Sequence, residues 1–123
     1  MLEKYNAEAK EKWGSTEAFA EYSEKTKDYT AQKWNSVAEG LDAIMKDFSL
    51  SMKEGDTPDS TKAQSLVKAL QDYITKTSYT CTKEILYGLG QMYVCDERFK
   101  SNIDRHGEGT ADYIRKAVEA YCR

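Results

Sequence analysis

Apolar side chains recur at every third or fourth position through most of this chain, and this spacing constrains the fold more than any other feature. Side chains spaced in this way share one face of an α-helix, which can then pack on a core. The longest series begins at Trp34 and continues through Val37, Ala38, Leu41, Ile44, Met45, Phe48 and Met52. The sequence has one proline, Pro58, and almost no consecutive β-branched residues, so a β-sheet is disfavoured. An all-α fold is therefore predicted.

Capping and turn residues divide the chain into separate helices. Thr30 is a suitable N-cap for the long helix, which the sequence GDTPDS ends in a loop. A second helix is expected from Asp59 or Ser60, a third after the sequence SYTCT, a short helical turn at 97–102 and a last helix from about Glu108. The residues expected to face inward are Leu66, Val67, Leu70, Tyr73, Ile74 and Thr77 in the second helix, Ile85, Leu89, Met92 and Tyr93 in the third, and Tyr113, Ile114, Ala117, Val118 and Tyr121 in the last.

Residues 1–30 differ from the rest of the chain, because their only large apolar side chains are isolated aromatics. These are Tyr5, Trp13, Phe19, Tyr22 and Tyr29. Short helices with little to pack against are marginally stable in water. We therefore expect one domain, 1–123, in which a mobile helical segment at 1–30 accompanies a helical core at 31–123.

The charge and the cysteine content disfavour several classes of protein. The formal net charge is −3, and acidic and basic residues alternate along the chain, so a direct nucleic-acid interface is disfavoured. The three cysteines have no paired spacing, which is typical of reduced thiols rather than of a disulfide framework. No apolar run reaches the length of a membrane span, and the N-terminus lacks the features of a signal peptide. A soluble cytoplasmic protein without membrane contact is predicted.

Catalytic and metal-binding chemistry has little support in the sequence. The single histidine, His106, lies in the polar sequence DRHGEG and is expected to be a solvated loop residue. No ligand pairs have the spacing of a zinc site, and no histidine faces the core from a helix as haem ligation would require. Cys81 is expected to be a small capping or core residue, although a thiol-redox role for Cys81 or Cys95 remains an alternative. We expect no enzyme activity, no metal and no cofactor.

Two glycines, Gly88 and Gly90, interrupt the apolar sequence EILYGLGQMYVCDERF in the third helix. Each costs an isolated helix about 1 kcal/mol relative to alanine, so either another helix or a ligand approaches the backbone closely here, or the helix bends at this point. Either the glycines permit a tight helix crossing, or they open an apolar groove beside the preceding helix, which the short SYTCT connection should place nearby. The periodicity alone leaves both interpretations open.

Several sequence blocks also carry a resemblance to a known family. They are EAKEKWGSTEA, KTKDYT, LVKALQDYI, YTCTKEI, GLGQMYVCDERF and SNID. In their order and spacing they resemble the TipA-type antibiotic-recognition (TipAS) domain, the effector-binding half of MerR-family transcriptional regulators. The run from Leu89 to Asp104 is the most specific part of the resemblance.

The resemblance implies a globin-like all-α fold without haem, whose cleft binds bulky hydrophobic antibiotics such as thiopeptides while a flexible N-terminal segment closes over them. It implies that DNA is reached only through a fused N-terminal helix-turn-helix domain, absent from this chain, and that the isolated domain is a monomer. The hypothesis is thus the drug-sensing domain of a transcriptional activator. Alternatives are a stand-alone antibiotic-sequestering resistance protein of the same fold and a helical protein-interaction module.

Two departures from the family bear on the site. Thiopeptide-responsive members have a reactive cysteine in the slot that Gly88 fills here, so covalent capture at that slot is excluded. Many members have a histidine where this sequence has Leu70, which implies a more apolar pocket and reversible binding. The residues expected to bind the ligand are Leu70, Tyr73, Ile74, Tyr79, Tyr87, Gly88, Gln91, Met92, Asn102 and Ile103, with Trp13, Tyr22 and Tyr29 from the segment that closes over the ligand.

Overall fold

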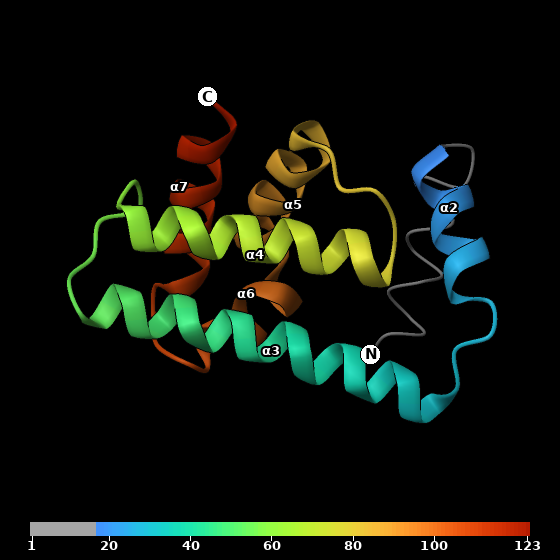
Figure 1. Ribbon diagram of the computed structural model, residues 1–123. Helices are drawn as coiled ribbons and strands as arrows, with labels where there is room; N and C mark the ends of the chain where they lie inside the picture. The colour runs from blue at the N-terminus through green and yellow to red at the C-terminus, as the bar shows by residue number, and fades with distance from the viewer. Residues whose placement is uncertain (1–16) are drawn as a thin grey trace.

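The computed structural model describes residues 17–123, so the predictions for Tyr5 and Trp13 lie outside the described residues. Within that range the helices are α2 (Glu17–Thr26), α3 (Ala31–Lys53), α4 (Thr61–Thr77), α5 (Lys83–Cys95), α6 (Glu97–Asp104) and α7 (Thr110–Cys122). Every regular element in this part of the chain is a helix, which confirms the predicted all-α fold (Figure 1). No helix between residues 17 and 123 combines the length and apolar character needed to cross a membrane.

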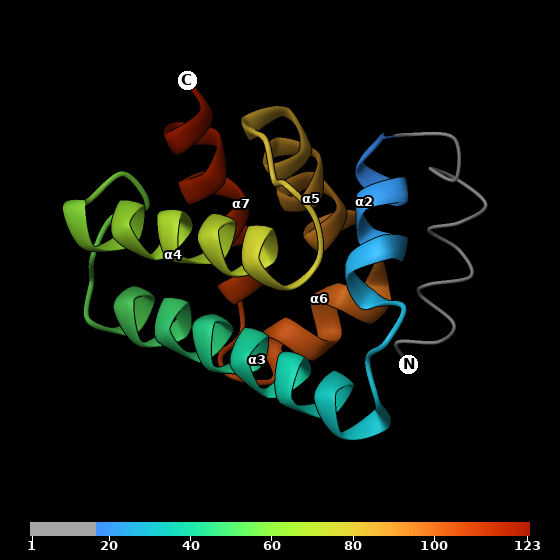
Figure 2. The same cartoon turned by 45° about the vertical axis from the view of Figure 1, so that its right-hand side comes forward.

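The helices are arranged around α7. α3 and α4 lie side by side, and α5 and α7 lie behind them, with α6 between α5 and α7 in the chain (Figure 1). α7 packs on α3, α4, α5 and α6, and its most extensive contact is with α5. In both views α2 stands on the far side of α5 from α7 (Figure 2).

The predicted helix starts follow from local capping. The Thr30 side chain accepts a hydrogen bond from the Lys33 N–H, which confirms the predicted N-cap, and Ser60, where the second helix was expected to begin, caps α4 by accepting one from the Ala63 N–H. The last helix begins at Thr110, later than predicted. The reason is Gly109, whose φ of 91° lies in the left-handed region and cannot continue a right-handed helix.

Side chains from α3 to α7 fill the core. Phe48, Leu70, Leu86 and Ile114 have no exposed surface. In α5 the buried residues are Leu86, Gly90 and Tyr93, whereas Ile85, Leu89 and Met92 are half-buried. Of the residues predicted to face inward from α5, Tyr93 is buried and the other three are half-buried. The buried side of the helix includes Gly90, and periodicity could not detect it because a glycine has no apolar side chain.

Candidate ligand-binding site

The two glycines of α5 have opposite surroundings. A Cβ atom on Gly90 would lie 3.2 Å from the Val118 side chain, so this glycine permits the close crossing of α5 and α7. A Cβ atom on Gly88 would meet no atom within 4 Å. Two residues correspond to about 200° around a helix, which places Gly88 on the side of α5 that faces away from α7. Tight crossing thus explains Gly90, and open space adjoins Gly88.

The side of α5 that carries Gly88 is apolar along one edge. Ile85, Gly88 and Met92 have the spacing i, i+3 and i+7 and so share this side, which we call the open face of α5. Ile85 and Met92 are half-buried and pack against the edge of the core. α5 lies between α7 and α2 in both views, so the side of α5 opposite α7 is the side nearer α2 (Figures 1 and 2).

Two other expected site residues of α5 lie on the α7 side. Gln91 donates a hydrogen bond from Nε2 to Oε1 of Glu119 at 2.8 Å. Tyr87 is 46% exposed and, with Glu119 and residues at the C-terminus, lines a shallow surface hollow. Tyr87 and Gln91 are neighbours of Gly88 and Met92 along α5, but the Gln91 side chain is directed to α7 by its hydrogen bond with Glu119.

Three expected site residues belong to the core. Leu70 and Ile103 are 0% and 3% exposed, and Ile74 is 9% exposed. The short connection after α4 predicted that α4 and α5 pack side by side, but α5 packs most extensively on α7, and α4 packs on α3 and α7. Asn102 is exposed on α6. These positions do not converge with the open face on one surface.

Tyr73 is held across α3. Its hydroxyl donates a hydrogen bond to the Val37 carbonyl at 2.7 Å. Gly40 makes room for the ring, because a Cβ atom there would overlap the Tyr73 hydroxyl. Burial, and to a lesser extent the charge of Tyr29, raises the pKa of Tyr73, so the hydroxyl stays protonated and able to donate. Gly40 was missed by the sequence analysis, although a glycine in the middle of a long helix is itself a signal of close approach.

Aromatic side chains gather where α2 meets the core. The centroid of the Tyr22 ring lies 6.2 Å from that of Trp34 and 6.4 Å from that of Tyr79. Tyr29 meets Trp34 edge-on at 5.1 Å, and Phe19 lies 6.0 Å from Tyr22. We call these five residues the aromatic wall. The expected residues Tyr22, Tyr29 and Tyr79 are thus brought together, with Phe19 and Trp34 as two members that the site prediction omitted.

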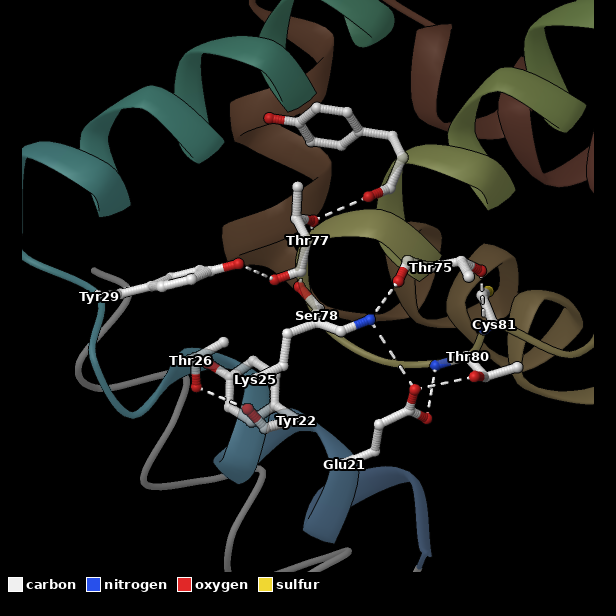
Figure 3. A network of polar contacts seen from close by, with 11 residues as sticks. Glu21, Tyr22, Lys25, Thr26, Tyr29, Thr75, Thr77, Ser78, Thr80 and Cys81 are labelled. Atoms are coloured by element: carbon white, nitrogen blue, oxygen red, sulfur yellow. Dashed lines mark hydrogen bonds and ion pairs between the residues drawn. The ribbon is translucent and has the colours of Figure 1, made fainter.

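Polar contacts accompany the aromatic wall (Figure 3). The two carboxylate oxygens of Glu21 accept hydrogen bonds from the N–H and the hydroxyl of Thr80, each at 2.8 Å. Lys25 Nζ donates to the Thr75 carbonyl and the Tyr29 hydroxyl donates to the Thr77 carbonyl, each at 2.7 Å. Side chains from α2 and the segment after it therefore reach the end of α4 and the loop that follows.

The family model of the TipAS antibiotic-recognition domain matches residues 5–121. The chain belongs to the TipAS family. This family is one of ligand-recognition domains and not of enzymes, which confirms the prediction that the chain is not an enzyme.

Relatives of this TipAS domain include transcriptional activators. The chain is 36% identical over 118 residues both to the HTH-type transcriptional activator mta of Bacillus subtilis and to the HTH-type transcriptional activator TipA of Streptomyces coelicolor. These matches cover 96% of this chain but 45% and 47% of the relatives, so the chain spans about half their length. A solved structure of TipAS in complex with nosiheptide, described as part of a thiopeptide antibiotic multidrug resistance system from Streptomyces lividans, is 34% identical. The structural alignment covers 99% of this chain and 85% of the TipAS chain, with a TM-score of 0.86.

The thiols of this TipAS domain differ in accessibility. Cys81 is 3% exposed, as expected for a core residue, and burial together with the charge of Cys122 raises the pKa of its thiol to about 11. Such a thiol holds very little thiolate near neutral pH, and the thiolate is the reactive form. Cys95 is exposed, at the end of α5. The described residues contain no group of three or more His, Cys, Asp or Glu side chains placed to hold a metal ion.

His106 is not the solvated loop residue that the sequence predicted. Its side chain is 14% exposed, and Nε2 lies 2.9 Å from Oδ1 of Asp42 on α3. Ser49 and Lys53 of α3 donate hydrogen bonds to the His106 carbonyl. The prediction was wrong because the α6–α7 loop lies against α3, a contact between segments far apart in the sequence. The histidine therefore joins two elements of the fold.

Proposed function

We propose that this TipAS domain binds large hydrophobic antibiotics of the thiopeptide class reversibly, as the drug-sensing domain of a cytoplasmic MerR-type transcriptional activator. The observation that carries the proposal is the similarity over 99% of the chain to a TipAS structure solved with nosiheptide. DNA is contacted by the helix-turn-helix part of the regulator, as the names of the relatives imply. Both relatives are activators, which favours a regulator over a stand-alone sequestering protein.

The ligand is placed between the open face of α5 and the aromatic wall, two apolar surfaces that lie on the same side of α5 in the proposal. Ile85 and Met92 offer apolar surface, and Gly88 leaves room for a bulky group. Tyr22 and Tyr79 add ring faces with polar hydroxyls, which suit a large ligand with both apolar and hydrogen-bonding groups. Burial of apolar area provides about 25 cal/mol per Å², less the entropy of ordering flexible segments. Affinity therefore requires a large ligand.

Binding is reversible because the glycine slot itself carries no thiol, and Cys95, which is seven residues further along the same face of α5, lies about 10 Å away along the helix axis. Gly88 has no side chain, and the thiol of Cys81 is buried in the core. The exposed thiol of Cys95 lies at the end of α5. Intact-mass measurement after incubation with nosiheptide should show the unmodified protein. A stable adduct would overturn reversibility.

Calorimetric titration of the purified domain with nosiheptide and other thiopeptides tests the ligand class and the location of the site. Gly88→Trp should abolish binding while leaving the circular dichroism unchanged and the melting temperature at or above that of the wild type, because its side chain projects into open space and glycine is the poorer helix former. Tyr87→Trp is the matched control, since it places the same indole ring on the adjacent residue, on the α7 side. This variant should bind as the wild type does. No binding of any thiopeptide by the wild type would overturn the ligand class. Unchanged binding by Gly88→Trp would overturn the location.

A further inference from the structure

The rotation of α5 about its own axis decides which side chains face the open space beside Gly88. Successive residues of a helix are about 100° apart, so a rotation of that size would replace Gly88 by the side chain of a neighbouring residue. On the opposite side of α5, Gly90 lies so close to α7 that a Cβ atom would be 3.2 Å from Val118. A glycine allows this close approach but has no side chain that interlocks with the other helix. Leu86 and Tyr93 are buried on the same side of α5 and limit its rotation in part.

Gln91 adds a directional contact next to this crossing. Its Nε2 donates a hydrogen bond to Oε1 of Glu119 at 2.8 Å. Gln91 follows Gly90 in α5 and Glu119 follows Val118 in α7, so the hydrogen bond adjoins the closest approach of the two helices. A hydrogen bond to a charged acceptor is stronger than a neutral one, and it weakens steeply when its geometry is distorted. The contact therefore opposes rotation of α5.

Glu119 is held in place from the α7 side. Arg115 donates from Nη1 to the same Oε1 at 2.9 Å, and its Nε and Nη2 donate to Oδ1 of Asp112 at 3.1 and 2.8 Å. The side chains of Arg115 and Glu119 are only 26% and 25% exposed, so solvent and salt screen this pair less than a fully exposed one. The hydrogen bond from Gln91 is the main cause that holds the pKa of Glu119 below its ordinary value. α7 thus presents a charged acceptor in a fixed position.

We propose that Gln91 is a positioning residue, which through Glu119 fixes the rotation of α5 that directs Gly88 towards the ligand. The sequence analysis expected Gln91 to bind the ligand itself, but its amide nitrogen is bonded to α7. The consequence for the ligand rests on the proposed function, whereas the fixed rotation of α5 does not. The contacts that carry the inference join α5 and α7 alone, so the inference does not depend on the position of α2.

Calorimetric titration with nosiheptide separates positioning from direct contact. If α5 is in the binding orientation only about a tenth of the time once this hydrogen bond is lost, the Kd should rise about tenfold. Gln91→Ala and Glu119→Ala should show this same increase, and the double variant should show no more, because both changes remove one contact. Glu119→Gln should restore most of the affinity, since its side-chain oxygen can accept from Gln91. Lys116→Ala is the matched control, because it removes a 3.2 Å ion pair with Asp112 within α7, and it should bind as the wild type does.

NMR relaxation dispersion of backbone amides tests the rotation without ligand. Gln91→Ala and Glu119→Ala should show microsecond-to-millisecond exchange in the amides of α5, and the wild type and Lys116→Ala should not. Circular dichroism and urea unfolding of each variant check that the domain stays folded, and the conservative Glu119→Gln gives a second test of the same contact.

Wild-type affinity in Glu119→Ala with weakened binding by Gln91→Ala would show a direct contact of Gln91 with the ligand and would overturn the positioning role. Wild-type affinity in both variants would overturn it as well. Absence of exchange in α5 of both variants would show that the core alone fixes the helix, with the same consequence. Failure of the wild type to bind nosiheptide would instead overturn the proposed function, and the relaxation measurement would still decide whether Gln91 fixes the rotation of α5.

Discussion

At the scale of single residues, Gly88 and Gly90 show that identical amino acids two positions apart can have different roles. Gly90 lies against Val118 of α7, and Gly88 borders open space. The sequence predicted that an unusual approach occurs in this stretch, because two helix-destabilising residues require one. It could not assign the approach to one glycine, because the rotation of α5 about its axis is set by its contact with α7.

Alanine substitution at each glycine should separate these roles. Gly90→Ala should destabilise the domain by about 1–3 kcal/mol, because the added methyl group crowds Val118 and forces α5 and α7 apart. Gly88→Ala is the matched control and should stabilise by about 0.5–1 kcal/mol, since only helix propensity changes. Urea unfolding of both variants and the wild type measures the difference. Equal effects of the two substitutions would contradict the assignment.

The thiols should react in an order set by exposure and pKa. At pH 8, iodoacetamide should modify Cys95 first, Cys122 more slowly and Cys81 only on unfolding, because burial raises the pKa of Cys122 and raises that of Cys81 to about 11. Peptide mass spectrometry over time gives the order. Modification of Cys95 should leave nosiheptide affinity unchanged, whereas a thiol-redox protein would lose its activity. Early modification of Cys81 in the folded domain would show that the core is open at that residue.

At the scale of elements, Gly40 and Tyr73 set how closely α3 and α4 pack. The Tyr73 ring lies where a side chain on residue 40 would be, and its hydroxyl is bonded to the Val37 carbonyl of α3. The register between the two helices therefore depends on a missing side chain in one helix and a hydroxyl in the other. The carbonyl of Tyr73 also accepts a hydrogen bond from the Thr77 hydroxyl, near the end of α4.

Gly40→Ala should destabilise the domain by about 1–3 kcal/mol in spite of the gain in helix propensity, because the methyl group displaces a rigid ring. Tyr73→Phe should cost about 1 kcal/mol through the lost hydrogen bond alone. Chemical unfolding of the two single variants and the double variant gives the coupling between the sites, and less-than-additive losses are expected because the residues touch. A stabilised Gly40→Ala would show that the ring has room to move.

Features that depend on residues close together in the sequence were predicted, and features that depend on residues far apart in the sequence were not. The N-cap Thr30 and a helix start at Asp59 or Ser60 were predicted, because each cap bonds a residue only three positions away. His106 was misjudged because its partner, Asp42, is 64 positions away. The apolar faces of α4 and α7 were predicted well, since both helices pack on the core through apolar side chains at helical spacing. The candidate site was predicted less well, because periodicity detects burial without distinguishing core residues from residues that line a pocket. Leu70, Ile74 and Ile103 were expected to bind the ligand, and they lie in the core.

At the scale of the whole molecule, the domain consists of a tightly packed group of helices around α7 and a helix, α2, attached by side chains. Carboxylates serve both parts. Asp104 accepts a hydrogen bond from the Ala111 N–H at the start of α7, and Glu21 accepts two from Thr80. The all-α fold was predictable from periodicity, but this division of labour was not, because it depends on which helices lie next to α7.

Acid should therefore weaken the domain as these carboxylates become protonated. Burial acts to raise the pKa of Asp104, but the hydrogen bonds from Ala111 and Lys100 outweigh burial and leave the pKa below the ordinary value of 3.8. The hydrogen bonds from Thr80 lower the pKa of Glu21 below the ordinary value of 4.5. A lowered carboxylate pKa gives stability that is complete above the ordinary value and lost as the pH falls through the folded value, because the unfolded chain binds more protons. The free energy of unfolding in urea should fall from pH 5 to pH 3. Asp104→Asn should be less stable than the wild type at pH 7 and should decline less steeply, since it lacks one of the titrating groups. Constant stability between pH 5 and pH 3 would show that these carboxylates do not support the fold.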